Sequence, residues 1–194
     1  RQAGKFAETS PKDSILPEDG ILTLGYMGYM RRDKGFYFLL EALEKLPPEM
    51  AARIRLIVCA RKDTKKLMDR LASLQNMLAA VLYADGYTHD ELDDIIAQMD
   101  VGLVTVLWED NLPQVAIEMH ARHIPLLTSD LGGAQELANF PDMVFKAGDV
   151  AAFHARLESL LNGEITQADY WKNPMAPLSM EQHIDRLLGH YGAA

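Results

Sequence analysis

One glycine-bounded segment of the sequence combines basic residues in a way that suits an anionic ligand. Residues 28–35 open on Gly28 and then carry Arg31, Arg32 and Lys34, directly after an apolar run and before a helical pattern. A helix that begins at such a segment exposes backbone amides and a partial positive charge, to which Lys34 adds a full charge. The segment predicts a phosphate site, although an exposed basic turn would show the same pattern.

A second segment places carboxylates where sugar hydroxyls could be bound. Residues 108–113 contain Glu109 and Asp110, and Glu118 follows about two helical turns later. Carboxylates accept hydrogen bonds from hydroxyl groups, so their position near a phosphate site suggests contact with a sugar. The alternative is structural: Asp110 as an acidic helix cap and Glu118 as a buried, hydrogen-bonded side chain.

A third segment, residues 128–134, ends in a double glycine before a helix. Gly132 and Gly133 would offer bare amides to an anion or a sugar. A plain tight turn would have the same composition.

The elements that must position these segments alternate regularly along the chain. Strands are predicted at residues 21–28, 54–60, 79–83, 101–107, 125–128 and 144–145. Helices are predicted at residues 36–46, 63–74, 88–99, 112–122, 150–161 and 180–191, with a further helix after the double glycine. The alternation predicts an α/β fold with a doubly wound, mostly parallel six-stranded sheet and helices on both faces. Ligands bind such folds beyond the carboxyl ends of the strands, here the loops 28–35, 60–63, 84–89, 107–113 and 128–134.

Local signals at helix ends give three further predictions. Pro47 and Pro48 should stop the helix that precedes them. Thr88 and Glu91 have the spacing of a capping box. His123 follows a helix at a position where glycine is usual, so we expect it to adopt a left-handed backbone conformation.

Composition excludes several classes of protein. The chain has 194 residues, of which 48% are hydrophobic and 24% charged, as in a folded globular protein. Its net charge of −9 argues against nucleic-acid binding. A single cysteine cannot form an intrachain disulfide, and no apolar stretch has the length of a transmembrane segment. We expect a cytoplasmic protein, with the membrane surface as an alternative place of action.

The chain divides into three parts. Residues 1–20 are polar and contain two prolines, which predicts a linker or N-terminal arm that does not pack. Residues 21–165 carry the alternating pattern of a Rossmann-like domain, to which the resemblance described next assigns nucleotide-sugar binding, and residues 166–194 form a C-terminal helical segment. The chain opens on Arg1 rather than Met, so we expect an excerpt of a longer polypeptide.

The order of five motifs carries a resemblance to a known family. They are Gly-Tyr-Met-Arg-Arg-Asp-Lys-Gly, Asp-Gly-Tyr-Thr-His-Asp-Glu-Leu, the Asp110 to Glu118 segment, Ser-Asp-Leu-Gly-Gly-Ala-Gln-Glu-Leu and Ala-Gly-Asp. In this order they resemble the C-terminal, donor-nucleotide-binding domain of GT-B glycosyltransferases, within the retaining family 4 group, also called glycosyl transferases group 1. The resemblance covers about residues 20 to 162.

The resemblance implies roles for the basic loop. Lys34 matches the family lysine that holds the donor diphosphate, beside Gly28 at the start of the loop. The family arginine usually follows that first glycine, where this chain has Tyr29, so Arg31 or Arg32 would substitute for it. The family also has a glycine-rich turn after the second strand, which this chain lacks.

The resemblance also implies roles for the acidic and glycine segments. Asp110 matches the first member of the family glutamate pair, beside the donor sugar, with Glu109 as an alternative, and Glu118 matches the second, on the nucleotide ribose. Together with Lys34, Asp110 and Glu118 are thus the catalytic candidates. Further donor contacts are implied for Asn111, Leu112, Gly132 and Gly133.

By this resemblance, the chain is the donor half of an enzyme that transfers a sugar from a nucleotide-diphosphate sugar with retention. The resemblance implies no metal and no cofactor, and a saccharide or lipid-linked acceptor held by a missing N-terminal domain. The isolated domain would then be inactive.

One alternative is a degenerate, non-catalytic nucleotide-sugar-binding or regulatory module. Another is a receiver-like domain, which needs acidic residues after the first strand that the sequence does not supply there. A metal site at His120 and His123 lacks a convincing third ligand.

Overall fold

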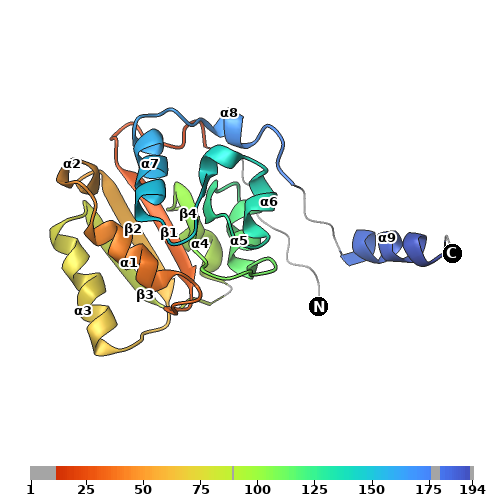
Figure 1. The fold of residues 1–194 in the computed structure, drawn as a ribbon, viewed down its shortest axis with the longest axis horizontal. Helices are drawn as coiled ribbons and strands as arrows, with labels where there is room; N and C mark the ends of the chain where they lie inside the picture. The colour runs from red at the N-terminus through yellow and green to blue at the C-terminus, as the bar shows by residue number, and fades with distance from the viewer. Residues whose placement is uncertain (1–11, 89, 176–179, 193–194) are drawn as a thin grey trace.

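The computed structural model describes residues 12–88, 90–175 and 180–192, and a parallel sheet of six strands lies at their centre (Figure 1). The strands are β1 (Leu22–Gly28), β2 (Ile54–Ala60), β3 (Ala80–Asp85), β4 (Val101–Val104), β5 (Leu126–Ser129) and β6 (Val144–Phe145). Their order across the sheet is β3-β2-β1-β4-β5-β6, and each neighbouring pair is parallel. The predicted fold class is confirmed.

Helices cover both faces of this sheet. They are α1 (Phe36–Glu44), α2 (Pro48–Ala51), α3 (Lys65–Ser73), α4 (Leu92–Ile96), α5 (Gln114–His120), α6 (Ala134–Ala138), α7 (Val150–Leu161), α8 (Gln167–Tyr170) and α9 (Met180–Gly192). Short 3₁₀ turns span Leu74–Asn76 and Pro141–Met143. Apolar side chains of α1, α3 and α7 form one core cluster, and those of α4, α5 and α6 form a second.

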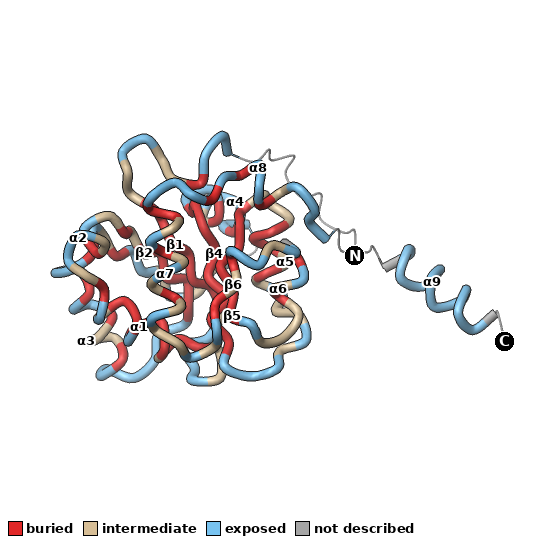
Figure 2. The backbone as a smooth tube through the Cα atoms, turned by 45° about the horizontal axis from the view of Figure 1, so that its top comes forward, coloured by how far each residue is buried: buried red, intermediate tan, exposed pale blue. Residues whose placement is uncertain are grey.

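The side chains of β1 alternate between the two clusters. Leu22, Leu24 and Tyr26 belong to the cluster with α1, whereas Met27 belongs to the cluster with α4. Figure 2 shows the buried strands between helices that carry both buried and exposed residues. Both faces of β1 are covered, as its continuous apolar run predicts. Each fully buried side chain of this kind contributes about 1.5–3 kcal/mol, so the sheet is a firm support for the loops at its edge.

The strand order reverses between β1 and β4. The chain builds outward from β1 to β2 and β3, and then crosses back to add β4, β5 and β6 on the other side of β1. The carboxyl ends of β1 and β4 therefore meet at a topological switch point, where open α/β sheets bind ligands.

The fourth strand is shorter than the predicted range 101–107. Beyond the sheet ladder Thr105 and Val106 remain buried, whereas Leu107 is exposed. The chain there bonds to other segments: Ser129 Oγ donates to the Val106 carbonyl at 2.8 Å. The Leu107 amide donates to the Asp33 carbonyl at 2.9 Å. A continuous apolar run does not distinguish a ladder from a buried loop of this kind, which is why the prediction was too long.

Two local predictions at helix ends need correction. Pro47 and Pro48 do end the helical region of α1, but Pro48 also starts α2, which was not predicted, because proline suits the first position of a helix. Of the capping box predicted at Thr88 only one half forms, the bond from its amide to Glu91. The Thr88 amide and hydroxyl both donate to the Glu91 carboxylate, at 2.8 and 2.7 Å, and α4 begins only at Leu92.

Residues 12–20 pack against the sheet, so the prediction of an unpacked arm was wrong for them. Ile15 is fully buried in the cluster with α1. Lys12 Nζ lies 2.7 Å from the carboxylate of buried Asp100, which also accepts a bond from the Thr23 amide at 2.9 Å. The polar composition of the segment hides these two anchors. The earlier part of the predicted arm lies outside the described residues.

The C-terminal part of the chain consists of a packed helix and an exposed one. Tyr170 in α8 is fully buried, and its hydroxyl accepts a bond from the Leu126 amide at 2.9 Å. Figures 1 and 2 show α9 apart from the sheet. Its exposed apolar side chains are Ile184, Leu187, Leu188 and Tyr191. Among the described helices, none combines the length and the hydropathy that crossing a membrane requires.

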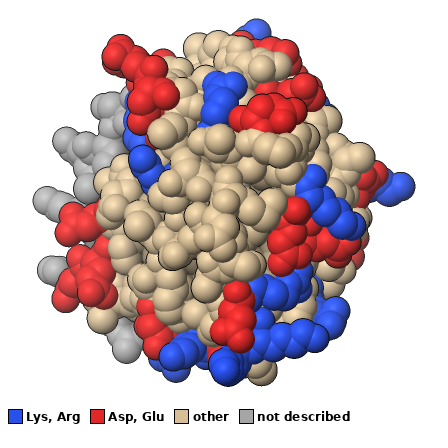
Figure 3. Space-filling model, turned by 90° about the vertical axis from the view of Figure 1, so that its left-hand side faces the viewer, with Lys and Arg blue, Asp and Glu red and all other residues tan. Residues whose placement is uncertain are grey.

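The charged surface is mixed rather than uniformly basic or acidic. Figure 3 looks onto the side where α2 and α3 lie in Figure 1, and basic and acidic side chains alternate there around an uncharged central area. Arg70 of α3 pairs with Glu44 at 2.8 Å. This is the pattern of a solvated helix face.

Candidate functional site

A cavity of about 480 Å³ opens at the carboxyl ends of β1 and β4. Its walls come from the end of β1 and the following loop, the ends of β2 and β4, the loop after β3 and the first turn of α5. Four of the five predicted ligand loops contribute residues to it, and residues 128–134 do not. The cavity lies at the switch point of the sheet.

The loop after β1 is fixed by buried groups on the neighbouring strands. The Tyr26 hydroxyl donates to the Tyr29 carbonyl at 2.8 Å. Burial, and then the charge of Asp33, raise the pKa of Tyr26, so it remains a donor. Gly35 has φ 74°, and a Cβ there would lie 1.5 Å from the Thr105 carbonyl oxygen. Only glycine fits at this contact between the loops.

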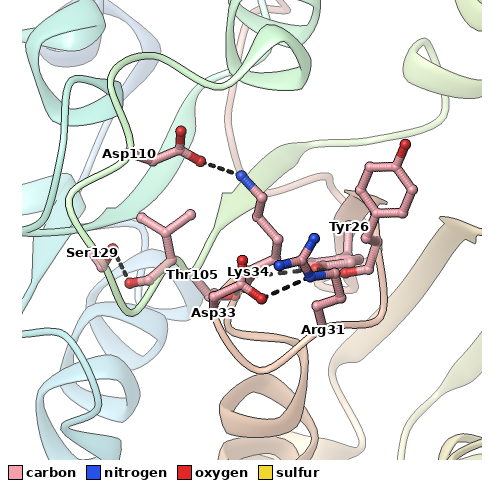
Figure 4. A network of polar contacts seen from close by, with 9 residues as sticks. Tyr26, Arg31, Asp33, Lys34, Thr105, Asp110 and Ser129 are labelled. Carbon is pink, nitrogen blue, oxygen red and sulfur yellow. Dashed lines mark hydrogen bonds and ion pairs between the residues drawn. The ribbon is translucent and has the colours of Figure 1, made fainter.

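Lys34 reaches from this loop to the acidic loop after β4 (Figure 4). Its Nζ lies 2.5 Å from Asp110 Oδ2 and 5.1 Å from the centroid of the Trp108 ring. The side chains of Lys34 and Asp110 are 27% and 14% exposed, so the pair is only partly screened by water. The structure thus brings together the predicted phosphate ligand and the predicted sugar-side carboxylate. An anion that binds Lys34 must either share the ammonium group with the Asp110 carboxylate or displace that carboxylate from it.

Arg31 and Arg32 do not line the cavity. Arg31 Nε donates to Asp33 at 2.9 Å, and the Arg32 guanidinium lies 4.5 Å from the centroid of the Tyr37 ring (Figure 4 shows the former). Arg31 is thus held by a partner two residues away in the sequence, and Arg32 by a partner five residues away. The structure therefore does not gather them with Lys34, as the proposed substitution for the family arginine would need.

Glu118 lines the cavity, and one of its carboxylate oxygens has no protein partner among the described residues. The residue is 8% exposed and lines the wall. Its Oε1 accepts a bond from Gln114 Nε2 at 2.9 Å, whereas no described residue bonds to the buried Oε2. Burial, and then the charge of Glu118, raise the pKa of nearby Tyr87. An unsatisfied buried oxygen costs free energy that a ligand hydroxyl could recover.

The double glycine joins two loops instead of presenting free amides. The Gly132 amide donates to Glu109 Oε2 at 3.1 Å, and the Gly133 amide donates to the Asp110 carbonyl at 3.0 Å. A Cβ on Gly132 would lie 2.0 Å from the Asp110 carbonyl oxygen. The expectation of bare amides was wrong here, because the Glu109 carboxylate and the Asp110 carbonyl already accept their hydrogen bonds.

Of the remaining residues predicted to contact the donor, one lines the cavity and two pack outside its wall. Gly28 lines the cavity with φ 126°, a backbone conformation that favours glycine. Asn111 and Leu112 lie outside the wall. The Asn111 carbonyl packs on Gly133, and Leu112 packs on the cluster with α5.

Sequence reasoning missed three residues of the wall. The predicted ligand loops 60–63 and 84–89 include Arg61 and Tyr87 without a role for either side chain, and Cys59 lies one residue before the first of these loops. Cys59 is buried, and burial raises the pKa of its thiol to about 11, so it is a neutral wall residue. Arg61 and Tyr87 each follow the end of a strand, and this position was the signal that could have identified them.

His120 does not line the cavity and packs instead against α8. Its ring packs 4.7 Å from Trp171 and 6.2 Å from Tyr170 of α8. Burial, and then neighbouring His123, lower the pKa of His120 to about 4. In the part of the chain that the structure describes, no three His, Cys, Asp or Glu side chains gather to hold a metal ion.

His123 adopts the predicted left-handed conformation, with φ 58°. Its amide donates to the His120 carbonyl at 3.0 Å, and the Ile124 amide donates to the Met119 carbonyl at 3.1 Å. These two bonds form a Schellman motif with His123 at C′. The prediction is confirmed.

Comparisons with solved structures show the same fold. The structure titled "OtsA apo structure" matches with a TM-score of 0.62 and 21% identity, over 81% of this chain and 41% of that one. An α,α-trehalose-phosphate synthase (UDP-forming) from Burkholderia vietnamiensis matches with a TM-score of 0.64 and 17% identity, over 79% and 40%. Anabaena HepE in complex with UDP matches with a TM-score of 0.67 and 18% identity, over 88% and 49%.

These neighbours are GT-B glycosyltransferases, and at such low identity the likeness concerns the fold alone. The chain spans less than half the length of each. A search of curated proteins gave no match. The family model described as Glycosyl transferases group 1 matches residues 7–174, which is most of the chain. Because this match covers more than half of the chain, the chain belongs to the glycosyl transferases group 1 family.

Proposed function

We propose that this chain is the donor-binding half of a retaining glycosyltransferase that uses a nucleotide-diphosphate sugar. Family membership supports sugar transfer. Neighbours solved with UDP and with UDP-2-fluoro glucose support a nucleotide-sugar donor. The observation that carries the proposal is the cavity whose wall holds both Lys34 and Glu118, a carboxylate with one unpartnered oxygen.

Each of the two groups has a chemical task in this proposal. Lys34 exchanges Asp110 for the donor diphosphate and neutralises the charge that develops on the leaving group. Glu118 accepts a hydrogen bond from a ribose hydroxyl, which satisfies its free oxygen. Asp110, once released from Lys34, faces the transferred sugar.

The acceptor is bound elsewhere. The chain covers 41% of the OtsA chain and 49% of the HepE chain. We therefore assign the saccharide or lipid-linked acceptor to a domain outside this chain. The chain by itself binds the donor and does not complete the transfer.

A second candidate function is a non-catalytic nucleotide-sugar-binding or regulatory module. It is favoured by the engagement of Lys34 with Asp110 and by the direction of Arg31 and Arg32 away from the cavity. Nucleotide binding without turnover in a protein that contains both domains would decide for this alternative.

The proposal is tested by ligand binding to the 194-residue chain. Melting temperature is measured with uridine, guanosine and adenosine diphosphates and with pyrophosphate; ligand at 100 times its Kd stabilises the fold by about 2.7 kcal/mol. Lys34→Ala should weaken pyrophosphate and nucleotides alike. Glu118→Gln should weaken nucleotides but leave pyrophosphate unchanged.

The matched control is Lys45→Ala, which removes an exposed lysine outside the cavity and should bind as the parent chain does. If no nucleotide raises the melting temperature at millimolar concentration, donor binding by this chain is wrong. For transfer with retention, the product of a two-domain protein must keep the anomeric configuration of the donor, as measured by NMR.

A further inference from the structure

The two sides of the cavity carry different cations. Lys34 lies on the β4 side, where it pairs with Asp110. Arg61 lines the other side, directly after the last residue of β2, and the register pairs that residue, Ala60, with Asp85 of β3. The two cations thus approach the cavity from different strands, Lys34 from the loop after β1 and Arg61 from the end of β2.

The Arg61 side chain lies toward the loop after β3. A Cβ placed on Gly86 would lie 3.6 Å from Arg61 Cγ, so the arginine stem covers this glycine. The Lys62 amide donates to Asp85 at 2.7 Å and fixes the loop to β3. Arg61 is exposed, and no hydrogen bond or ion pair joins its guanidinium to another residue in the described ranges. Its donors are therefore available to a ligand.

The wall residues occur in the order of the parts of a nucleotide. Under the proposed function, the diphosphate lies at Lys34 and the ribose at Glu118. Tyr87 lies close enough to Glu118 to be influenced by its charge, and it follows Gly86, which Arg61 covers. Phosphate, ribose and base are joined in this sequence, so the base reaches the Tyr87 and Arg61 end.

The chemistry of a guanidinium then selects among bases. Arginine has five N–H donors and no acceptor. Uracil and guanine present a carbonyl oxygen, O4 or O6, where cytosine and adenine present an amino group. An aromatic ring such as Tyr87 stacks on any base and does not discriminate. We propose that Arg61 reads the base of the donor nucleotide and makes this site favour uracil or guanine over adenine and cytosine. This inference rests on the proposed function.

The test is calorimetric titration of the 194-residue chain with the four nucleoside diphosphates and with pyrophosphate. The parent chain should bind UDP or GDP about ten-fold or more tightly than ADP and CDP, the size of one charge-assisted hydrogen bond. Arg61→Gln should reduce that preference to about two-fold or less, with pyrophosphate affinity unchanged. Arg61→Lys keeps the charge but loses the planar fork, and should also lose most of the preference.

Lys62→Gln is the matched control, because it removes the same charge one residue later from a side chain that does not line the cavity. It should retain the parent preference. An unchanged preference in Arg61→Gln overturns the inference, as does an equal loss for pyrophosphate and all nucleotides, which would make Arg61 a phosphate ligand. A parent chain that prefers ADP or CDP overturns it as well. Failure of the parent to bind any nucleotide refutes the proposed function itself, and this inference with it.

Discussion

Mild acid should destabilise the fold through His120, and His120→Phe should remove that part of the pH dependence. The imidazole is only 6% exposed and packs against Trp171, and its Nε2 has no partner among the described residues. Burial, and then the nearby His123, lower the pKa of His120 from 6.5 to about 4. Protonation in the folded state would place a charge in this aromatic cluster.

The sign and the size follow from proton linkage. Between about pH 6.5 and pH 4 the unfolded chain binds a proton at His120 that the folded chain excludes, so stability falls as the pH falls. The contribution is complete above about pH 6.5 and lost by about pH 4. Each pH unit of this interval contributes about 1.4 kcal/mol, for an upper limit of about 3.4 kcal/mol. Water that reaches part of the ring screens the charge and lowers the expected loss to about 2 kcal/mol.

The assay is urea unfolding at half-unit steps from pH 4 to pH 7.5. Other groups also titrate in this range, so the quantity of interest is the difference between the parent chain and His120→Phe. As the pH is lowered from 7 to 4, the free energy of unfolding of His120→Phe should rise by about 2 kcal/mol relative to that of the parent chain. His190→Gln, in exposed α9, is the control and should follow the parent curve.

Two results would refute this reasoning. Stability curves of the parent and of His120→Phe that run parallel across the interval would show that His120 does not exclude the proton. An NMR titration of the His120 ring with a midpoint near pH 6.5 would show the same directly.

Three other predictions concern stability. Gly132→Ala should cost about 2 kcal/mol or more, because its Cβ would meet the Asp110 carbonyl at 2.0 Å from a φ of 74°, and denaturant unfolding measures this cost. His123→Gly should stay within about 1 kcal/mol of the parent, since relief of the left-handed backbone offsets the lost contact with Trp171 at 5.4 Å. His123→Ala should lose about 1 kcal/mol relative to it, and a more stable alanine variant would contradict the argument. A chelator or a reductant should leave the melting temperature unchanged, because Cys59 is a buried free thiol and no metal-binding group of side chains occurs among the described residues; a fall of several degrees with either reagent would count against it.

The fold could be predicted because the apolar runs are long and their spacing is regular. The predicted ranges 54–60 and 144–145 agree with β2 and β6 to the residue. The errors lie at residues whose burial does not follow from strand pairing or from the local composition of the sequence. In the apolar run at 101–107, Thr105 and Val106 stay buried after the ladder ends. The polar residues 12–20 contain the buried Ile15 and an exposed lysine, Lys12, that pairs with buried Asp100.

The site could be predicted only in part, because the direction of a side chain depends on distant partners. Lys34 and Glu118 follow from the rule that ligand groups lie after strand ends, and both line the cavity. The pairing of Lys34 with Asp110 joins residues 76 apart, and the bond from Gly132 to Glu109 joins residues 23 apart. Neither contact leaves a signal in local composition.

The loops after β1, β4 and β5 form one connected unit around the predicted ligand position. The Asp110 carboxylate pairs with Lys34, and its backbone carbonyl accepts a bond from Gly133. The Leu107 amide donates to Asp33, in the same loop as Lys34. A phosphate that takes Lys34 from Asp110 therefore alters a residue that also supports the loop after β5. Under the proposed function, donor binding would be coupled to the position of the acidic loop, because Asp110 both competes for Lys34 and joins the two loops.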